Sequence, residues 1–228
     1  MIKNFIRETI LIAKKDLAIE RATGEIVTTS GFFALLLTVL SSRAFYTYTS
    51  ELDAQLAPGV IWLSVTFASV LGLSRSWTRE REEGALRGLV VAPLARGAIF
   101  AGKAIGVLAF ITAIEVLVIP AAAILLNFDL GRYIGALAVI GVLANVGIAS
   151  TGTLFGAMTV RTRARDLVLA SVLLPLLAPT LITAVVATRE LFSGASFGEL
   201  WDYFNLMLIF DVVFTAAGLG LFGMLIEG

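Results

Sequence analysis

The sequence contains no cysteine and no histidine. Without cysteine, the chain has no disulfide, thiolate ligand or thiol nucleophile. Without histidine, it lacks the commonest acid–base catalyst and the commonest transition-metal and haem ligand. We therefore expect no catalytic residue, no metal site and no cofactor bound directly to this chain.

Charged residues are also scarce, at 15% of the chain against 58% hydrophobic residues. In soluble domains about a quarter of the residues are charged. The length of 228 residues leaves room for about six helices of ~20 residues and their loops. The composition predicts an all-α polytopic membrane protein with a single transmembrane domain, residues 1–228, and no separate soluble domain.

Six apolar stretches mark the expected transmembrane helices. They cover residues 26–42, 56–73, 104–126, 133–160, 167–187 and 203–226. Residues 1–24 have the pattern of an amphipathic helix lying in the membrane interface, and Gly24 is expected to end it. A polar loop is expected at 47–55, with Pro58 in the first turn of the second span. Residues 188–202 predict a short amphipathic helix on the outer face.

Lysine and arginine are distributed unevenly among the loops. Five precede Gly24, six lie from Arg75 to Lys103 and three lie from Arg161 to Arg165, whereas the opposite side has three. Positive loops stay in the cytoplasm. We therefore expect both termini, residues 75–103 and the loop at 161–165 to be cytoplasmic.

Residues 75–103, here called the coupling segment, interrupt the apolar pattern between the second and third spans. Apolar residues recur at helical spacing within it, opposite charged residues. This pattern favours a short amphipathic helix, residues 82–91, that offers a docking surface to a soluble partner, although a solvated charged loop is the alternative. The candidate interface residues are Glu80, Glu82, Glu83, Gly84, Leu86, Arg87, Leu89, Val90 and Pro93.

Residues 97–104 read GAIFAGKA, which matches most of a phosphate-binding loop. Ala104 stands where the motif needs the hydroxyl that holds Mg²⁺, and the stretch precedes a membrane span instead of joining a strand to a helix. We therefore expect ATP, if it drives this protein, to be hydrolysed by another subunit.

Two carboxylates, Glu115 and Asp211, fall inside predicted spans. A charge at the centre of a membrane costs roughly 3 kcal/mol or more, so such residues mark either a translocation or gating role or a hydrogen-bonded helix contact. An intramembrane enzyme is a third class, but the spans hold no nucleophile–base set, and Asp211 is the only aspartate deep within one.

Small residues and prolines suggest particular helix contacts. Gly152 and Gly156 form a small-x-x-x-small pattern that predicts close packing, within the chain or against a second copy. Pro175 and Pro179 are expected to bend the fifth span, because each removes a backbone donor.

The coupling segment carries a resemblance to a known family. EREEG at residues 80–84, Ala92-Pro93 and Gly102-Lys103 resemble the permeases of ABC-2-type exporters. The stretches LAPGVIW at 56–62 and LGLSR at 71–75, with the residue pair 174–175 and Pro179, are similar to the haem exporter protein B (CcmB) family of cytochrome c maturation. The resemblance implies six spans, an N-terminal interfacial helix, a coupling helix and outer helices between spans five and six.

The resemblance also implies partners. These are an ABC ATPase subunit, a haem-handling membrane protein and a small single-span subunit. Apart from the resemblance, we expect contact with membrane lipid, a second copy of the chain as an open alternative, and no nucleic acid. ATP would then be bound by the ATPase and haem by the partner subunits, in a bacterial inner membrane. The expected function is a permease subunit that couples ATP hydrolysis to release of a haem-loaded periplasmic chaperone. The alternative is an ABC-2-type permease that exports a lipid-linked glycan or a drug.

Overall fold

The computed structural model describes residues 2–44, 50–82, 84–85, 88, 91–159 and 165–227, and the side chains of these except 50–54, 165–170 and 227. Over this part of the chain there are seven long α-helices and no β-strand. The helices are α1 (Ile2–Thr23), α2 (Glu25–Ala44), α3 (Ser50–Glu82), α5 (Arg96–Leu125), α6 (Leu130–Thr159), α7 (Arg165–Phe192) and α8 (Trp201–Glu227).

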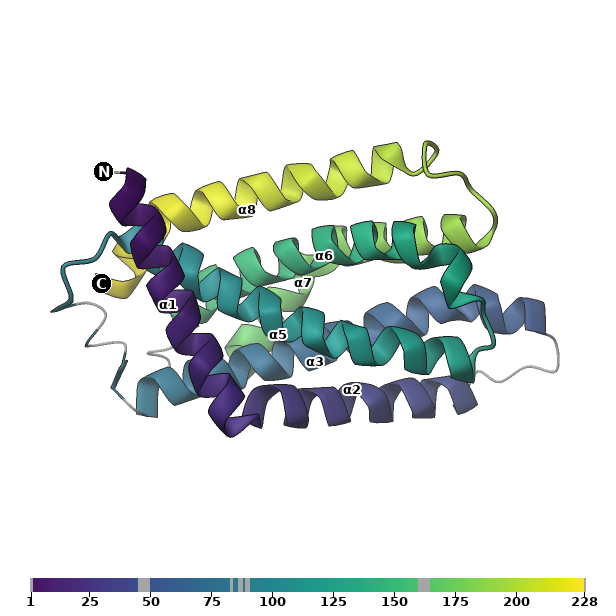
Figure 1. Cartoon of the computed structure of the whole chain (residues 1–228), viewed down its shortest axis with the longest axis horizontal. Helices are drawn as coiled ribbons and strands as arrows, with labels where there is room; N and C mark the ends of the chain where they lie inside the picture. Colours follow the sequence, from purple (N-terminus) through teal and green to yellow (C-terminus); the bar gives the residue numbers. More distant parts are fainter. Residues whose placement is uncertain are drawn as a thin grey trace.

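Helices α2, α3, α5, α6, α7 and α8 form an elongated bundle, and α1 lies across one of its ends (Figure 1). The N- and C-termini both lie at this end, which we call the α1 end; the opposite end is the far end. All six bundle helices contain a stretch long and apolar enough to cross a membrane. The all-α, multi-pass architecture predicted from composition is therefore confirmed.

Helix α1 has two different sides. Thr9, Ile12 and Ala13 are buried, and α1 packs mainly on α5, while Ile2 and Ile6 are exposed on another side. Such an arrangement suits a helix in the membrane interface, with an apolar stripe left for lipid. At its end, Gly24 has a φ of +62°, a left-handed conformation that glycine adopts without strain, as predicted.

The bundle interior contains two apolar clusters. The larger joins α2, α3, α5, α6, α7 and the first turns of α8, and it includes Trp62, whose indole N–H donates to the Thr188 hydroxyl at 2.9 Å. The smaller lies near α1 and contains Ile12, Trp77, Phe100 and Phe222. The smaller cluster thus packs α1 onto the ends of α3, α5 and α8.

Helices α3 and α5 begin well before the apolar stretches predicted for them. Helix α3 begins at Ser50 and ends at Glu82, so residues 50–55 are helical instead of a polar loop, and Pro58 lies inside the helix, not in its first turn. Helix α5 begins at Arg96, eight residues before the expected start. Arginine and glutamate are good helix formers, so a helix continues past the hydrocarbon when such residues follow the apolar run.

The prediction of a short outer helix at 188–202 is wrong. Helix α7 continues to Phe192, residues 193–200 form turns, and α8 begins at Trp201. Gly194, with a φ of +100°, ends α7. Beyond it, the Glu199 carboxylate accepts from the Ser196 backbone N–H at 2.6 Å, which stabilises a turn and lowers the pKa of Glu199 below its ordinary value.

Candidate functional site

A cluster of charged side chains lies where α1 crosses the ends of α3 and α5. Lys103 on α5 is 3% exposed, and its ammonium donates to Asp16 of α1 at 3.0 Å and to Glu80 of α3. Lys15 contacts the same two carboxylates, Glu80 at 3.0 Å and Asp16 at 2.9 Å. Two cations and two carboxylates from three helices thus form one network, here called the Lys103 cluster.

Small residues make this meeting of helices possible. A Cβ at Gly102 would lie 2.6 Å from Cβ of Ile12 and 2.8 Å from the Thr9 carbonyl oxygen, too close for any larger side chain. One turn further along α5, a Cβ at Gly106 would lie 3.3 Å from Cβ of Asp16. The two glycines let α1 approach α5 closely enough for Asp16 to reach Lys103.

The charges of the cluster compensate one another. An ammonium buried alone would cost several kcal/mol, so Lys103 depends on its two carboxylates. The ring of Trp77, 5.9 Å from the Lys103 ammonium, adds a cation–π contact. Burial alone acts to lower the pKa of Lys15, but the charges of Asp16 and Glu80 outweigh it and raise that pKa above its ordinary value.

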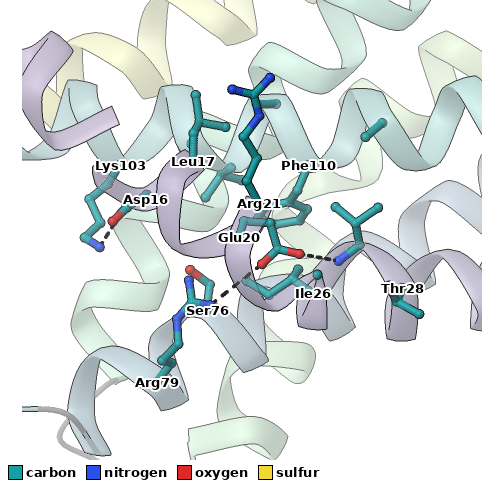
Figure 2. Close-up of a pocket in the computed structure, with 16 residues that line it drawn as sticks. Asp16, Leu17, Glu20, Arg21, Ile26, Thr28, Ser76, Arg79, Lys103 and Phe110 are labelled. Carbon is teal, nitrogen blue, oxygen red and sulfur yellow. Dashed lines mark hydrogen bonds and ion pairs between the residues drawn. The ribbon is translucent and has the colours of Figure 1, made fainter. Parts of the chain in front are cut away.

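Further polar contacts hold α1 along its length. The Glu8 carboxylate accepts from the backbone N–H of Ala95, the residue before α5, at 3.0 Å. Near the other end of α1, Glu20 accepts from the backbone N–H of Val27 at 2.8 Å and faces Arg79 of α3 at 3.7 Å (Figure 2). Helix α1 is therefore bonded to both helices that flank the coupling segment.

The predicted docking residues fall into two groups. Glu83, Leu86, Arg87, Leu89 and Val90 lie outside the described residues. The remaining four are described, and they are Glu80, Glu82, Gly84 and Pro93.

These four residues differ in position. Glu82 and Pro93 are exposed, whereas Glu80 belongs to α3, is 6% exposed and points inward to the Lys103 cluster. Gly84, at a φ of +65°, separates α3 from the helical backbone that follows, in which the Ala92 N–H donates to the Gly88 carbonyl at 3.0 Å. The coupling segment is thus not one helix from residue 82, because Gly84 interrupts it.

Residues 97–103, which match most of a phosphate-binding loop, lie inside the first turns of α5. Their backbone N–H groups face along a helix and do not form the loop that would surround a phosphate. Lys103 is bonded to carboxylates instead. The sequence interpretation that this stretch is not a nucleotide site agrees with its structure.

The two carboxylates inside the spans lie on opposite faces of α6. Glu115 accepts from the Asn145 carboxamide and fills the space beside Gly141. Asp211 is 4% exposed and lies against Gly147, and neither of its oxygens has a hydrogen-bond partner among the described residues. Residues 141 and 145 share one face of α6 and residue 147 lies on the other, so the structure does not bring the two carboxylates together.

The predicted packing residues have contacts within the chain. A Cβ at Gly152 would overlap the side chain of Leu73, and one at Gly156 would overlap the indole of Trp77, both on α3. Pro175 and Pro179 lie inside α7, which continues as a helix through both.

Sequence reasoning missed three polar partners. Lys15, Asp16 and Asn145 are not among the candidate site residues that the sequence indicates. The sequence offered only a weak signal for them: Asn145 is a polar amide within a predicted span, and Lys15 and Asp16 are two charged residues on a surface-lying helix.

Comparison with known proteins assigns the chain to a family. Its relatives include three proteins named heme exporter protein B. That of Rhodobacter capsulatus is 31% identical over 140 residues, 61% of this chain and 64% of the relative. That of Paracoccus denitrificans is 30% identical over 142 residues, 62% of this chain and 65% of the relative. That of Pseudomonas aeruginosa is 25% identical over 186 residues, 82% of each chain.

The chain spans slightly less than two thirds of the length of the first two relatives. A family model described as CcmB protein matches residues 7–222, and this range includes the Lys103 cluster, the coupling segment and all six bundle helices at least in part. The chain therefore belongs to the CcmB family.

Proposed function

We propose that this chain is the membrane permease subunit of an ABC-type haem exporter complex that acts in cytochrome c maturation. It is non-catalytic: a partner ATPase hydrolyses ATP, other subunits handle haem, and the cycle releases a haem-loaded periplasmic chaperone. The observation that carries the proposal is the match of residues 7–222 to the CcmB family. Relatives named heme exporter protein B support the haem-related pathway.

The uneven distribution of lysine and arginine supports an orientation for the α1 end. Fourteen of the 17 basic residues belong to α1, the coupling segment and residues 161–165. In a bacterial inner membrane this distribution favours a cytoplasmic α1 end, on the side where an ATPase is found. The haem-handling protein, the single-span subunit and a second copy of this chain complete the proposed complex.

The Lys103 cluster supports a mechanical route from the ATPase into the bilayer. Within the coupling segment, α3 ends at Glu82, two residues after Glu80, and α5 begins at Arg96, seven residues before Lys103. Glu80 and Lys103 are both bonded to α1, through Lys15 and Asp16 respectively. A push on the coupling segment therefore moves the ends of α3 and α5 together with α1 as one body. Closure of the ATPase would tilt the bundle helices through this body.

A second candidate function is export of another substrate, such as a lipid-linked glycan or a drug, through the bundle. The observation that favours it is Asp211, whose buried carboxylate has no hydrogen-bond partner among the residues described. Asp211→Asn and Glu115→Gln would abolish transport under this candidate. Under the first proposal these variants change stability or assembly and leave ATPase coupling intact.

The docking surface is tested with one apolar and one charged position. Val91 is 84% exposed in the coupling segment, so Val91→Asp places a charge where an apolar anchor would enter the ATPase. Loss of a central anchor costs about 2 kcal/mol or more, roughly a 30-fold weaker association. We expect Val91→Asp and Glu82→Lys to lower co-purification of the ATPase, its coupled activity and cytochrome c maturation, with normal amounts of the protein in the membrane.

The matched control is Phe197→Asp, which puts the same charge on an exposed apolar residue at the far end of the bundle. It should leave ATPase association unchanged. Normal association and maturation in both coupling-segment variants, or equal loss in the control, would overturn the docking proposal. Absence of any ATPase in a pull-down of the unmodified protein would overturn the proposed complex itself.

A further inference from the structure

A cavity of about 350 Å³ opens between α1, α2, α3 and α5 beside the Lys103 cluster (Figure 2). Its volume lies at the lower end of the range for ligand sites and equals that of about ten water molecules. Val107, Phe110 and Ala113 of α5 form an apolar wall, with Ile26 and Val27 of α2 nearby. Arg79 and Glu20 lie at its polar side. The cavity therefore combines an apolar wall with charged groups.

The two charged groups at the polar side are only loosely paired. The closest contact between Arg79 and Glu20, from Nη1 to Oε2, is 3.7 Å, too long for a hydrogen bond. Each of these two atoms is buried and has no hydrogen-bond partner among the described residues. Buried charged atoms without such a partner are costly, so this gap favours a ligand that offers an acceptor to Arg79 and a donor to Glu20.

The other charged residues that line the cavity are either paired or directed away from Arg79 and Glu20. Lys103 is compensated by Asp16 and Glu80, and the Arg21 side chain extends away from Glu20 and Arg79 (Figure 2). Arg79 and Glu20, which are not hydrogen-bonded to each other, have a combined net charge of zero. A ligand with one negative and one positive group therefore fits better than an anion or a cation alone.

The position of the cavity indicates where such a ligand comes from. The cavity lies at the corner where the surface-lying α1 turns at Gly24 into the membrane-spanning α2. This corner is at the depth of lipid headgroups, and the apolar wall on α5 continues toward the hydrocarbon. A glycerophospholipid offers a headgroup, its phosphate and, beyond the glycerol, acyl chains in this order.

We propose that this cavity binds the headgroup of an ethanolamine glycerophospholipid from the leaflet next to α1. The phosphate accepts hydrogen bonds from Arg79, the primary ammonium donates to Glu20, and the start of an acyl chain lies along Val107, Phe110 and Ala113. Choline headgroups have no N–H to donate to Glu20, and glycerol headgroups have no cation. The site therefore discriminates among the common headgroups by chemistry.

The test is native mass spectrometry of the full-length protein released from lipid nanodiscs. The nanodiscs contain phosphatidylcholine mixed with either phosphatidylethanolamine or phosphatidylglycerol. We expect one phosphatidylethanolamine retained per chain, with a preference of about tenfold or more over each of the other two lipids, the effect of one charged hydrogen bond. Parallel samples with soluble glycerophosphoethanolamine and with inorganic phosphate distinguish a lipid from a free phosphate compound.

Three variants assign the contacts. Arg79→Gln should reduce retention of phosphatidylethanolamine by about tenfold. Glu20→Gln should remove the preference over phosphatidylcholine, and Ala113→Phe should block the apolar wall without changing any charge. The matched control is Lys14→Gln, which removes an exposed cation from the same helix as Glu20 and should retain the lipid normally.

Several results would overturn the proposal. Equal retention of all three lipids, or preferential retention of phosphatidylglycerol, contradicts recognition of a zwitterion. Binding of the soluble compounds as tight as that of the lipid contradicts a membrane source. Should Arg79→Gln fail to fold, an unchanged lipid preference in both Glu20→Gln and Ala113→Phe would contradict the assigned site by itself.

Discussion

Removal of the Lys103 ammonium should destabilise the protein far more than removal of an exposed cation nearby. Lys103→Met keeps most of the aliphatic chain and its packing but leaves Asp16 and Glu80 with one cation, Lys15, in place of two. Breaking a buried ion pair in this way costs about 3–5 kcal/mol. Because Lys15 still contacts both carboxylates, we expect a loss near the lower end, about 3 kcal/mol.

The matched control is the ion pair of Arg75 and Glu25, which joins α3 to α2 close to the same site. Its side chains are 41% and 52% exposed and lie 3.3 Å apart. Exposed pairs contribute about 1 kcal/mol or less, so Arg75→Met should lower the free energy of unfolding by no more than that. The two substitutions remove one cation each and differ mainly in burial.

The measurement is reversible unfolding in mixed micelles with increasing sodium dodecyl sulfate, followed by tryptophan fluorescence. Trp77 lies beside Lys103 and reports directly on this region. Adding Glu80→Gln to Lys103→Met should recover part of the loss, because it removes an uncompensated carboxylate, with a coupling energy of about 1–3 kcal/mol. The reasoning is refuted if Lys103→Met costs no more than Arg75→Met, or if the two losses in the double variant simply add.

Two further predictions concern contacts deeper in the bundle. Gly156→Ala should lower the free energy of unfolding by about 1–3 kcal/mol, because the new methyl group overlaps the Trp77 indole. The control Gly220→Ala, where the new methyl group meets no heavy atom, should not destabilise the protein. Thermal unfolding of both variants checks this. Asn145→Leu should destabilise the protein by about 1–3 kcal/mol, because Glu115 loses its hydrogen-bond donor. Adding Glu115→Leu should restore stability. A double variant no more stable than Asn145→Leu alone in the same assay would contradict this.

The bundle could be predicted from the sequence because its physical basis is local. A stretch of about 20 apolar residues must form a helix in a membrane, whatever surrounds it. Helix ends are less constrained, since exposed residues such as Arg81 and Glu82 continue a helix into water at little cost. The prediction of an outer helix was wrong because apolar spacing alone indicated a helix in a stretch where Gly194 ends α7.

The Lys103 cluster could not be predicted in the same way. Its contacts join residues 87 and 65 positions apart, Asp16 with Lys103 and Lys15 with Glu80. Such pairings depend on where α1 crosses the bundle, and a periodic pattern in one helix says nothing about that crossing. The sequence marked Glu80 as part of a charged run and Lys103 as a family marker, but no local rule links the two.

The dependence of α1 on distant partners also sets an order of events during synthesis. Asp16 leaves the ribosome 87 residues before Lys103. At common translation rates this interval lasts roughly 4–17 seconds. During that time α1 has no α5 to pack on, and we expect its exposed isoleucines to hold it at the bilayer surface. It packs on the bundle after α5, the third transmembrane helix, has been synthesised.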